Sequence, residues 1–253
     1  MSPLAPTSLP QDPTAPVLRL TGVRHAFGAT EVLHDISLTV APGSFVALVG
    51  PSGCGKTTLL HLLSGHDPPT AGTVEHRGTS RMVYQHDGLF PWLTVEENIA
   101  FGLRQIPDPS TRAARLVEML RLIRLAGFER HYPHQLSGGM RQRVELARAL
   151  AGETELLLMD EPFSSLDDLT RRHLRRELAL MLRERPCTVV LVTHDIEEAV
   201  ELADRVIVLS ERPARVQYEL AVDLERPRSP THPTVVQAVD EVLRALGLGR
   251  GGA

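Results

Sequence analysis

The stretch FVALVGPSGCGKTTLLHLLSG, residues 45–65, decides the fold. Its centre matches the pattern G-x-x-x-x-G-K-[ST], with Gly50, Gly55, Lys56 and Thr57 at the fixed positions. The FVALV run before it is typical of a buried strand, and the leucine-rich run after it is typical of a helix. In that context the glycines let the backbone curl, so that successive N–H groups point inward and bind phosphate. We therefore predict a strand–loop–helix unit that binds the phosphates of a nucleotide.

Each residue of this loop has an expected part in nucleotide binding. Lys56 is predicted to reach the outer phosphates, and the Thr57 hydroxyl is predicted to bind Mg²⁺. Lys56 is also the only lysine in the chain. A compact ammonium fits between phosphate oxygens where a planar guanidinium would clash, so we interpret this lysine as a requirement of the site. The cysteine of the loop is interpreted as a small, tolerated residue. The other loop residues expected to contact nucleotide are Pro51, Ser52, Gly53, Cys54 and Thr58.

The stretch LLLMDEP, residues 156–162, supplies the second half of the predicted site. Its apolar run is typical of a buried strand, and this strand ends at Asp160. We expect the Asp160 carboxylate to hold Mg²⁺ through water, and the adjacent Glu161 to accept a proton from an attacking water molecule. With the phosphate loop, this pair indicates a P-loop NTPase.

Composition narrows the possible partners. The chain has 253 residues, 42% hydrophobic residues, a net charge of −4 and only 4% aromatic residues, which disfavours a nucleic-acid partner. Its two cysteines are too few for a disulfide framework and favour a reducing compartment. No apolar run approaches the roughly 18 residues that span a bilayer, so we expect any membrane association to come through a partner.

Alternating strand and helix patterns predict an α/β core. A proline-rich tail, 1–16, is expected to be disordered, and residues 17–225 are expected to form the nucleotide-binding domain. Within that domain the pattern is helical from about 94 to 151, which we interpret as an inserted subdomain. Residues 226–253 form an expected C-terminal extension with one helix at 231–246. The predicted strands are 17–23, 32–40, 44–50, 73–76, 81–85, 155–160, 188–193 and 205–210.

A second candidate phosphate site lies at LSGGMRQRVELARAL, residues 136–150. A serine and two glycines directly precede a helical pattern, and free N–H groups at the positive end of a helix bind phosphate. The sequence therefore raises the question of why one chain needs two such sites.

With LSGGMRQR between the phosphate loop and LLLMDEP, the chain resembles the ATP-binding subunit of an ABC transporter, from about Val17 to Leu209. The resemblance implies a P-loop NTPase core with a mixed sheet, an N-terminal antiparallel β subdomain and an inserted helical signature subdomain. The alternative is a non-transport ABC ATPase acting on DNA or another macromolecule. The interval between the loop and LSGG is short, with no sustained heptads and no CxxC, which favours the transporter.

The same resemblance assigns further site residues. Phe27 stands where an aromatic ring stacks on adenine, although it could be ordinary core. Gln85 is expected to sense the γ-phosphate and to bind Mg²⁺, and the alternative is a solvated strand end. His194, after TVVLVT, resembles the switch histidine, although a lone histidine is more often structural. SSLD, residues 164–167, resembles the D-loop, where Asp167 could also cap a helix. Catalysis is thereby assigned to Glu161, His194, Gln85 and Lys56, and further nucleotide contacts to Ser137, Gly138, Gly139 and Asp167.

The resemblance also answers the question of the two phosphate sites. It implies a head-to-tail dimer, in which Ser137 and Gly139 of one copy meet the γ-phosphate of an ATP bound by the other. The implied partners are an integral membrane permease and, indirectly, an extracytoplasmic solute-binding protein, and the implied location is the cytoplasmic face of the inner membrane. LFPWLTVEENIAFGL, residues 89–103, resembles the nitrate, sulfonate and taurine importers. Trp92 in this stretch is a candidate permease contact or, alternatively, packing between subdomains.

Overall fold

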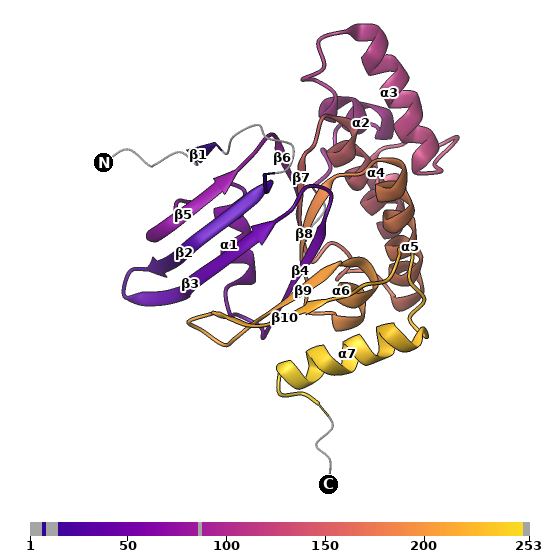
Figure 1. The fold of residues 1–253 in the computed structure, drawn as a ribbon. Coiled ribbons are helices and arrows are strands. Elements are labelled where there is room, and N and C mark those ends of the chain that lie inside the picture. Colours follow the sequence, from indigo (N-terminus) through magenta and orange to yellow (C-terminus); the bar gives the residue numbers. More distant parts are fainter. Residues whose placement is uncertain (1–6, 9–14, 86–87, 250–253) are drawn as a thin grey trace.

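The computed structural model describes residues 7–8, 15–85 and 88–249. These residues form two sheets and a layer of helices (Figure 1). The larger sheet has the strand order β10-β9-β4-β8-β7-β6, and the smaller has the order β1-β5-β2-β3. The predicted α/β core with a mixed sheet and an N-terminal antiparallel sheet is confirmed.

Short runs of β-branched and aliphatic residues form the centre of the larger sheet. These strands pair in parallel, and almost every side chain in them is buried, as expected for strands covered on both faces. They are β4 (Phe45–Val49), β7 (Leu156–Asp160), β8 (Thr188–Val192) and β9 (Arg205–Leu209).

The two edge strands differ from the predictions. β6 (Ser80–Val83) pairs in parallel with β7 but ends two residues before Gln85, because its register with β7 stops at Val83. The prediction that Gln85 ends a strand is therefore wrong. β10 (Val216–Ala221) pairs antiparallel with β9 and was not predicted, because this edge strand is mostly exposed and lacks a buried apolar run.

The smaller sheet is built on the hairpin of β2 (Leu18–Phe27) and β3 (Thr30–Val40), and β5 (Ala71–His76) pairs antiparallel with β2. The outer edge of β5 pairs in parallel with β1 (Thr7–Ser8). The prediction of a disordered tail is wrong at these two residues, because a strand edge offers free backbone groups for pairing. Residues 1–6 and 9–14 of the predicted tail lie outside the described residues, and residues 15–16 belong to neither a helix nor a strand.

Helix α1 (Lys56–Leu63) directly follows the phosphate loop and packs between the two sheets. Its leucines belong to the same buried cluster as the smaller sheet and as Val46 and Leu48 of β4. Phe45 and Val49 of β4 point the other way, into the cluster beneath the helix layer. This alternation buries both faces of the larger sheet and fixes the loop at its carboxyl edge.

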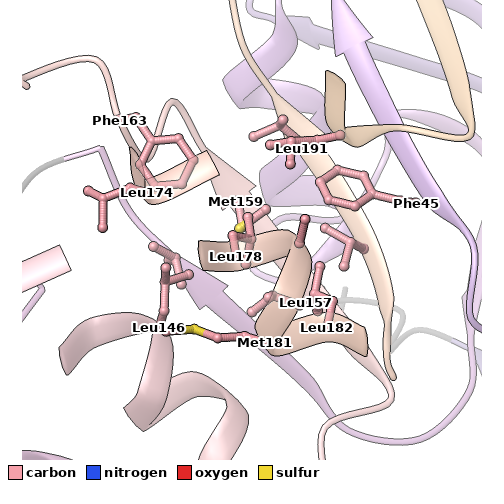
Figure 2. Close-up of a cluster of buried hydrophobic side chains, with 14 of the residues drawn as sticks. Phe45, Leu146, Leu157, Met159, Phe163, Leu174, Leu178, Met181, Leu182 and Leu191 are labelled. Carbon is pink, nitrogen blue, oxygen red and sulfur yellow. The ribbon is translucent and has the colours of Figure 1, made fainter. Parts of the chain in front are cut away.

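Helices cover the other face of the larger sheet, where Leu157, Met159 and Leu178 meet (Figure 2). The apolar stripe of α5 is buried there and consists of Leu174, Leu178, Met181 and Leu182. The helical block 94–151 contains three α-helices and one 3₁₀ turn, and the predicted C-terminal helix is present. The elements are α2 (Val95–Gly102), α3 (Pro109–Leu122), η1 (Pro133–Gln135), α4 (Gly138–Ala151), α5 (Asp168–Glu184), α6 (Ile196–Leu202) and α7 (Pro233–Ala245).

Across the part of the chain that the structure describes, no helix combines the length and the apolar character that crossing a membrane requires.

Candidate active site

The phosphate loop connects the end of β4 to the start of α1. Gly55 has a φ of +118°, and a Cβ at this position would lie 2.7 Å from Cγ1 of Val32 on the neighbouring β3. Both the backbone conformation and the close packing therefore require glycine here. The loop is thus held by the sheet beneath it, with its N–H groups at the start of α1.

Lys56 lies inside the curl of the loop. Its Nζ donates hydrogen bonds to the carbonyl oxygens of Gly50 (2.8 Å) and Pro51 (3.0 Å), and the residue is only 6% exposed. The ammonium group therefore stands among the backbone groups that the sequence predicts to surround phosphate.

Thr57 and Asp160 meet although they are far apart in sequence. The Thr57 hydroxyl donates a hydrogen bond of 3.3 Å to Oδ1 of Asp160, which ends β7 and is 6% exposed. Burial raises the pKa of Asp160, and the Thr57 hydrogen bond opposes that shift. A hydroxyl and a buried carboxylate are hard oxygen ligands, and a buried carboxylate gains from a paired cation. The pair therefore fits Mg²⁺.

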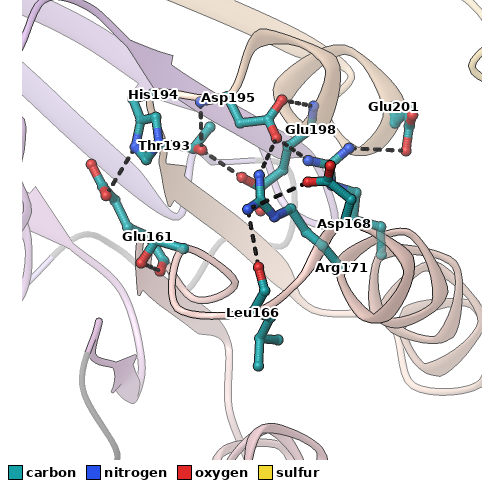
Figure 3. Close-up of polar contacts among 11 residues, drawn as sticks. Glu161, Leu166, Asp168, Arg171, Thr193, His194, Asp195, Glu198 and Glu201 are labelled. Carbon is teal, nitrogen blue, oxygen red and sulfur yellow. Dashed lines mark hydrogen bonds and ion pairs between the residues drawn. The ribbon is translucent and has the colours of Figure 1, made fainter. Parts of the chain in front are cut away.

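The side chains of Glu161, His194 and Gln85 converge beside this pair. Oε2 of Glu161 is 3.0 Å from Nδ1 of His194 (Figure 3) and accepts a hydrogen bond of 3.4 Å from Nε2 of Gln85. The Glu161 backbone has a φ of +43°, a conformation that costs a non-glycine residue on the order of 1–3 kcal/mol. Its N–H donates to the carbonyl oxygen of Val192, the last residue of β8, and this bond helps to hold the strained turn.

A cleft of about 450 Å³ opens beside these groups. Phe27, the last residue of β2, lines it and is 58% exposed, so the prediction that it could be ordinary core is wrong. The edge of its ring contacts His25, with the ring centroids 4.8 Å apart. An exposed aromatic face at the mouth of a phosphate-lined cleft is suited to stacking on a base. The lining residues are Phe27, Thr30, Val32, Ser52, Gly53, Gly55, Lys56, Thr57, Thr58, Glu161 and Arg212.

Arg212 is a cleft residue that the sequence analysis missed. It lies in the turn between β9 and β10, and its guanidinium donates two hydrogen bonds, of 3.2 and 2.5 Å, to the carbonyl oxygen of Gly53. The two residues are 159 positions apart. No local pattern marks this arginine, and only the pairing of β9 with β4 brings it to the loop.

The LSGG segment does not reach this cleft in its own chain. Ser137 is exposed and caps α4 by accepting a hydrogen bond of 3.3 Å from the N–H of Met140. Among the described residues that line the cleft there is no member of the LSGG segment, and Asp167 is also absent. The structure therefore keeps the two predicted phosphate sites apart within one chain.

Close packing explains why the two glycines of this segment carry no side chain. A Cβ at Gly138 would lie 2.9 Å from Cδ2 of Leu166, and a Cβ at Gly139 would lie 2.8 Å from Cγ2 of Thr170. Glycine thus lets the start of α4 pack directly on the segment that begins α5. Asp167 caps α5 by accepting a hydrogen bond of 3.1 Å from the N–H of Thr170, so the predicted capping role is confirmed.

A charged network, formed by Arg171, Arg175, Thr193, Asp195 and Glu198, orders the segment that carries His194 (Figure 3). Arg171 binds both Asp195, at 3.3 Å, and the carbonyl oxygen of Leu166, at 3.1 Å. Burial opposes ionisation of Asp195, but the N–H of Glu198 and the two arginines hold its pKa below the usual range. This network joins the SSLD segment to the turn after β8.

Glu198 is a deeply buried carboxylate of this charged network. It is 3% exposed and accepts a short hydrogen bond from the Thr193 hydroxyl. Burial raises its pKa from 4.5 to about 7, against the opposing effects of Thr193 and Arg175. Asp195 caps α6, because its Oδ1 accepts a hydrogen bond of 3.0 Å from the Glu198 N–H.

The aromatic stretch before α2 is held rigidly yet exposes its tryptophan. Asn98 is fully buried, and its amide donates to the carbonyl oxygens of Phe90 and Leu93. Trp92 is 69% exposed, so packing between subdomains does not account for most of its surface. A fixed backbone with an exposed indole is typical of an interaction surface.

Comparison with known proteins agrees with this geometry. A family model described as "ABC transporter" matches residues 33–164. The aliphatic sulfonates import ATP-binding protein SsuB of Bacillus licheniformis is 44% identical over 223 residues, which cover 85% of this chain and 87% of the relative. The taurine import ATP-binding protein TauB of Burkholderia pseudomallei is 48% identical over 208 residues, covering 79% and 80%. Among solved structures, the dimeric structure of MJ0796, a bacterial ABC transporter cassette, has a TM-score of 0.67 and 30% identity, covering 84% of this chain and 99% of that one.

Proposed function

This chain belongs to the ABC transporter family, and from that premise we propose that it is the ATP-hydrolysing subunit of a solute importer. The observation that carries the proposal is the convergence of Glu161, His194 and Gln85 beside a phosphate loop. A protein that bound nucleotide only as a structural ligand would not need this carboxylate–imidazole pair. Within the chain, residues 17–225 form the proposed ATP-binding domain, 94–151 its helical subdomain, and 226–253 an extension.

The proposed reaction is transfer of the γ-phosphoryl group of ATP to water. Glu161 accepts the proton of the attacking water, while His194 and Gln85 hold the Glu161 carboxylate in place. Lys56 balances the negative charge of the phosphate oxygens. Thr57 and Asp160 would hold Mg²⁺, which supplies further charge stabilisation when bound. Phe27 stacks on the adenine ring.

We further propose that two copies pair head to tail. Ser137 lies exposed at the positive end of the 14-residue helix α4, outside the cleft of its own chain. A second copy would bring that helix end to the γ-phosphate, so that triphosphate favours the closed dimer and hydrolysis releases it. Asp167 lies beside the same surface, at the start of α5.

The motion must reach a membrane partner. Trp92 is exposed a few residues after Gln85. A movement of Gln85 when the γ-phosphate is lost would therefore also displace the aromatic stretch. We assign this stretch to contact with an integral membrane permease, which places the chain as a peripheral subunit on the cytoplasmic face. The solute, delivered by an extracytoplasmic binding protein, is a nitrate, sulfonate, taurine or related small molecule. The import names of the similar proteins support this class.

The proposal is tested by purifying the complex of this chain with a candidate permease from membranes and reconstituting it in vesicles. ATP hydrolysis should rise when binding protein loaded with an alkanesulfonate or taurine is present inside the vesicles. Trp92→Ala should reduce transport more than the hydrolysis rate of the isolated chain, whereas Tyr218→Ala, a change at an exposed aromatic on β10, should not. Normal assembly and transport with Trp92→Ala would contradict the coupling role.

A further inference from the structure

A second concave site lies away from the nucleotide cleft, between α5, α6 and the segment that precedes α7. Its volume is about 520 Å³. Four arginines and one carboxylate line it, although the whole chain carries a net charge of −4. Two of these arginines are ion-paired, Arg175 with Asp195 and Arg228 with Asp204. The lining residues are Arg172, His173, Arg175, Arg176, Ala179, Glu201, Leu202, Pro227, Arg228, Ser229 and Pro230, which we call the arginine pocket.

Two exposed arginines stand at the rim of this pocket, and one of them, Arg172, is close enough to Glu201 to favour the charged form of that carboxyl. Arg172 and Arg176 stand four residues apart on α5, both exposed, and like charges at this spacing repel each other. Neither side chain contacts a carboxylate among the residues that the structure describes. Asp168, one turn before Arg172, instead lies 3.8 Å from Arg171. The rim therefore presents two guanidinium groups on one face that make no direct contact with a described carboxylate.

The deeper wall of the pocket is fixed. Arg228 donates hydrogen bonds to the carbonyl oxygens of Leu224, Val200, Ala203 and Val222, and its side chain is fully buried. These bonds use its N–H groups, and Oδ1 of Asp204 lies 3.6 Å from its Nη2, so Arg228 has little left to donate to a ligand. It makes the segment from 227 to 230 a rigid wall opposite α5.

The floor of the pocket holds an incompletely bonded arginine. Arg175 is 3% exposed, pairs with Asp195, and has Nη1 3.7 Å from Oε2 of Glu201. Its Nε is buried and has no hydrogen-bond partner among the described residues. A buried N–H without a partner is costly, so the floor of the pocket carries a guanidinium whose hydrogen bonds are incomplete.

We propose that the arginine pocket binds a small oxyanion of the sulfate, phosphate or sulfonate type. Guanidinium groups donate paired N–H bonds that match the oxygens of such anions, and the two rim arginines keep N–H groups that no described carboxylate contacts. The same chemistry can come from a free ion or from the headgroup of an anionic lipid. The inference does not depend on the proposed transport function.

The pocket touches the charged network that orders His194. Arg175 lies at the floor of the pocket and also binds Asp195, the residue that directly follows His194. Arg175 would therefore connect an oxyanion in the pocket to the turn that carries this histidine.

Calorimetric titration of the full chain tests the proposal, with saturating MgADP present to occupy the phosphate loop. Sodium sulfate is added at constant ionic strength, balanced with chloride. We expect saturable binding of one sulfate per chain, and Arg172→Gln with Arg176→Gln should weaken it about tenfold or more. The matched control is Arg183→Gln with Arg244→Gln, which removes the same charge from exposed arginines outside the pocket and should leave binding unchanged. Melting temperatures establish that both double variants fold.

A second arm separates the two sources of the oxyanion. Co-sedimentation with phosphatidylglycerol vesicles is compared with co-sedimentation with phosphatidylcholine vesicles, for the same three proteins. Sulfate binding that depends on the pocket supports a free ion, and vesicle binding that depends on the pocket without sulfate binding supports a lipid headgroup. If neither occurs, or if the two double variants behave alike, the arginine pocket is not an oxyanion site.

Discussion

Glu161 has the central role in the reaction that we propose, because it accepts the proton of the attacking water. It has a left-handed backbone conformation, and its carboxylate contacts both His194 and Gln85. We expect Glu161→Gln to bind ATP normally but to lower the hydrolysis rate on the order of 10²–10³-fold, because the amide cannot accept the proton of water. Phosphate release under single-turnover conditions measures this change. Glu153→Gln, a change at an exposed acidic residue before β7, is the control, and full activity in Glu161→Gln would contradict the assignment.

Arg212 allows a sharper test, because the chain offers a matched neighbour. Its guanidinium lines the nucleotide cleft and holds the carbonyl oxygen of Gly53 in the phosphate loop. Arg212→Ala should weaken ATP binding about tenfold through the loss of a charge-assisted hydrogen bond that orders the loop. Arg215→Ala removes the same charge from an exposed position in the same turn. Equal ATP affinities of the two variants would show that Arg212 contributes only through net charge.

Among the secondary-structure elements, α6 carries an expected dependence on pH. Glu198 at its first turn has a pKa of about 7 in the folded chain, above its ordinary 4.5. A raised pKa means that the folded state binds the proton more tightly than the unfolded state, so the free energy of unfolding falls as the pH rises from about 4.5 to about 7 and is constant above that range.

Glu198→Gln should lose this part of the pH dependence, because the amide cannot ionise, while its oxygen still accepts the Thr193 hydroxyl. Urea unfolding at pH 5 and pH 8 measures the difference between the two free energies of unfolding. Glu197→Gln, at the exposed neighbouring position, should keep the slope of the unchanged protein. The same slope in Glu198→Gln and in the unchanged protein would rule out this origin of the pH dependence.

For the molecule as a whole, the separation of Ser137 from its own cleft predicts that hydrolysis needs two copies. The hydrolysis rate per chain should therefore fall on dilution. Ser137→Asp should prevent the ATP-dependent dimer of Glu161→Gln, because aspartate still caps α4 but repels triphosphate. Ser137→Asn, a neutral cap, is the control, and analytical ultracentrifugation with ATP measures both. A rate per chain that is indifferent to dilution would refute the shared site.

The sequence alone determined the chemistry that we propose for the nucleotide site, because the motifs behind that proposal are short local patterns. The phosphate loop, LLLMDEP and LSGG each place their functional residues within a few positions of a strand end or a helix start. The buried strands were equally predictable, since continuous apolar runs leave few alternatives. Edge strands were not: β10 is largely exposed, and the end of β6 depends on its register with β7.

Only the tertiary structure decided which distant residues share a surface. Arg212 reaches Gly53 because parallel pairing of β9 with β4 puts the turn after β9 beside the loop after β4. The packing of α5, α6 and the segment before α7 likewise assembles the arginine pocket from three parts of the chain. Such contacts produce no repeating pattern in the sequence. A hydrogen bond between surface groups requires two residues to be close in space, but it does not fix their spacing in the sequence.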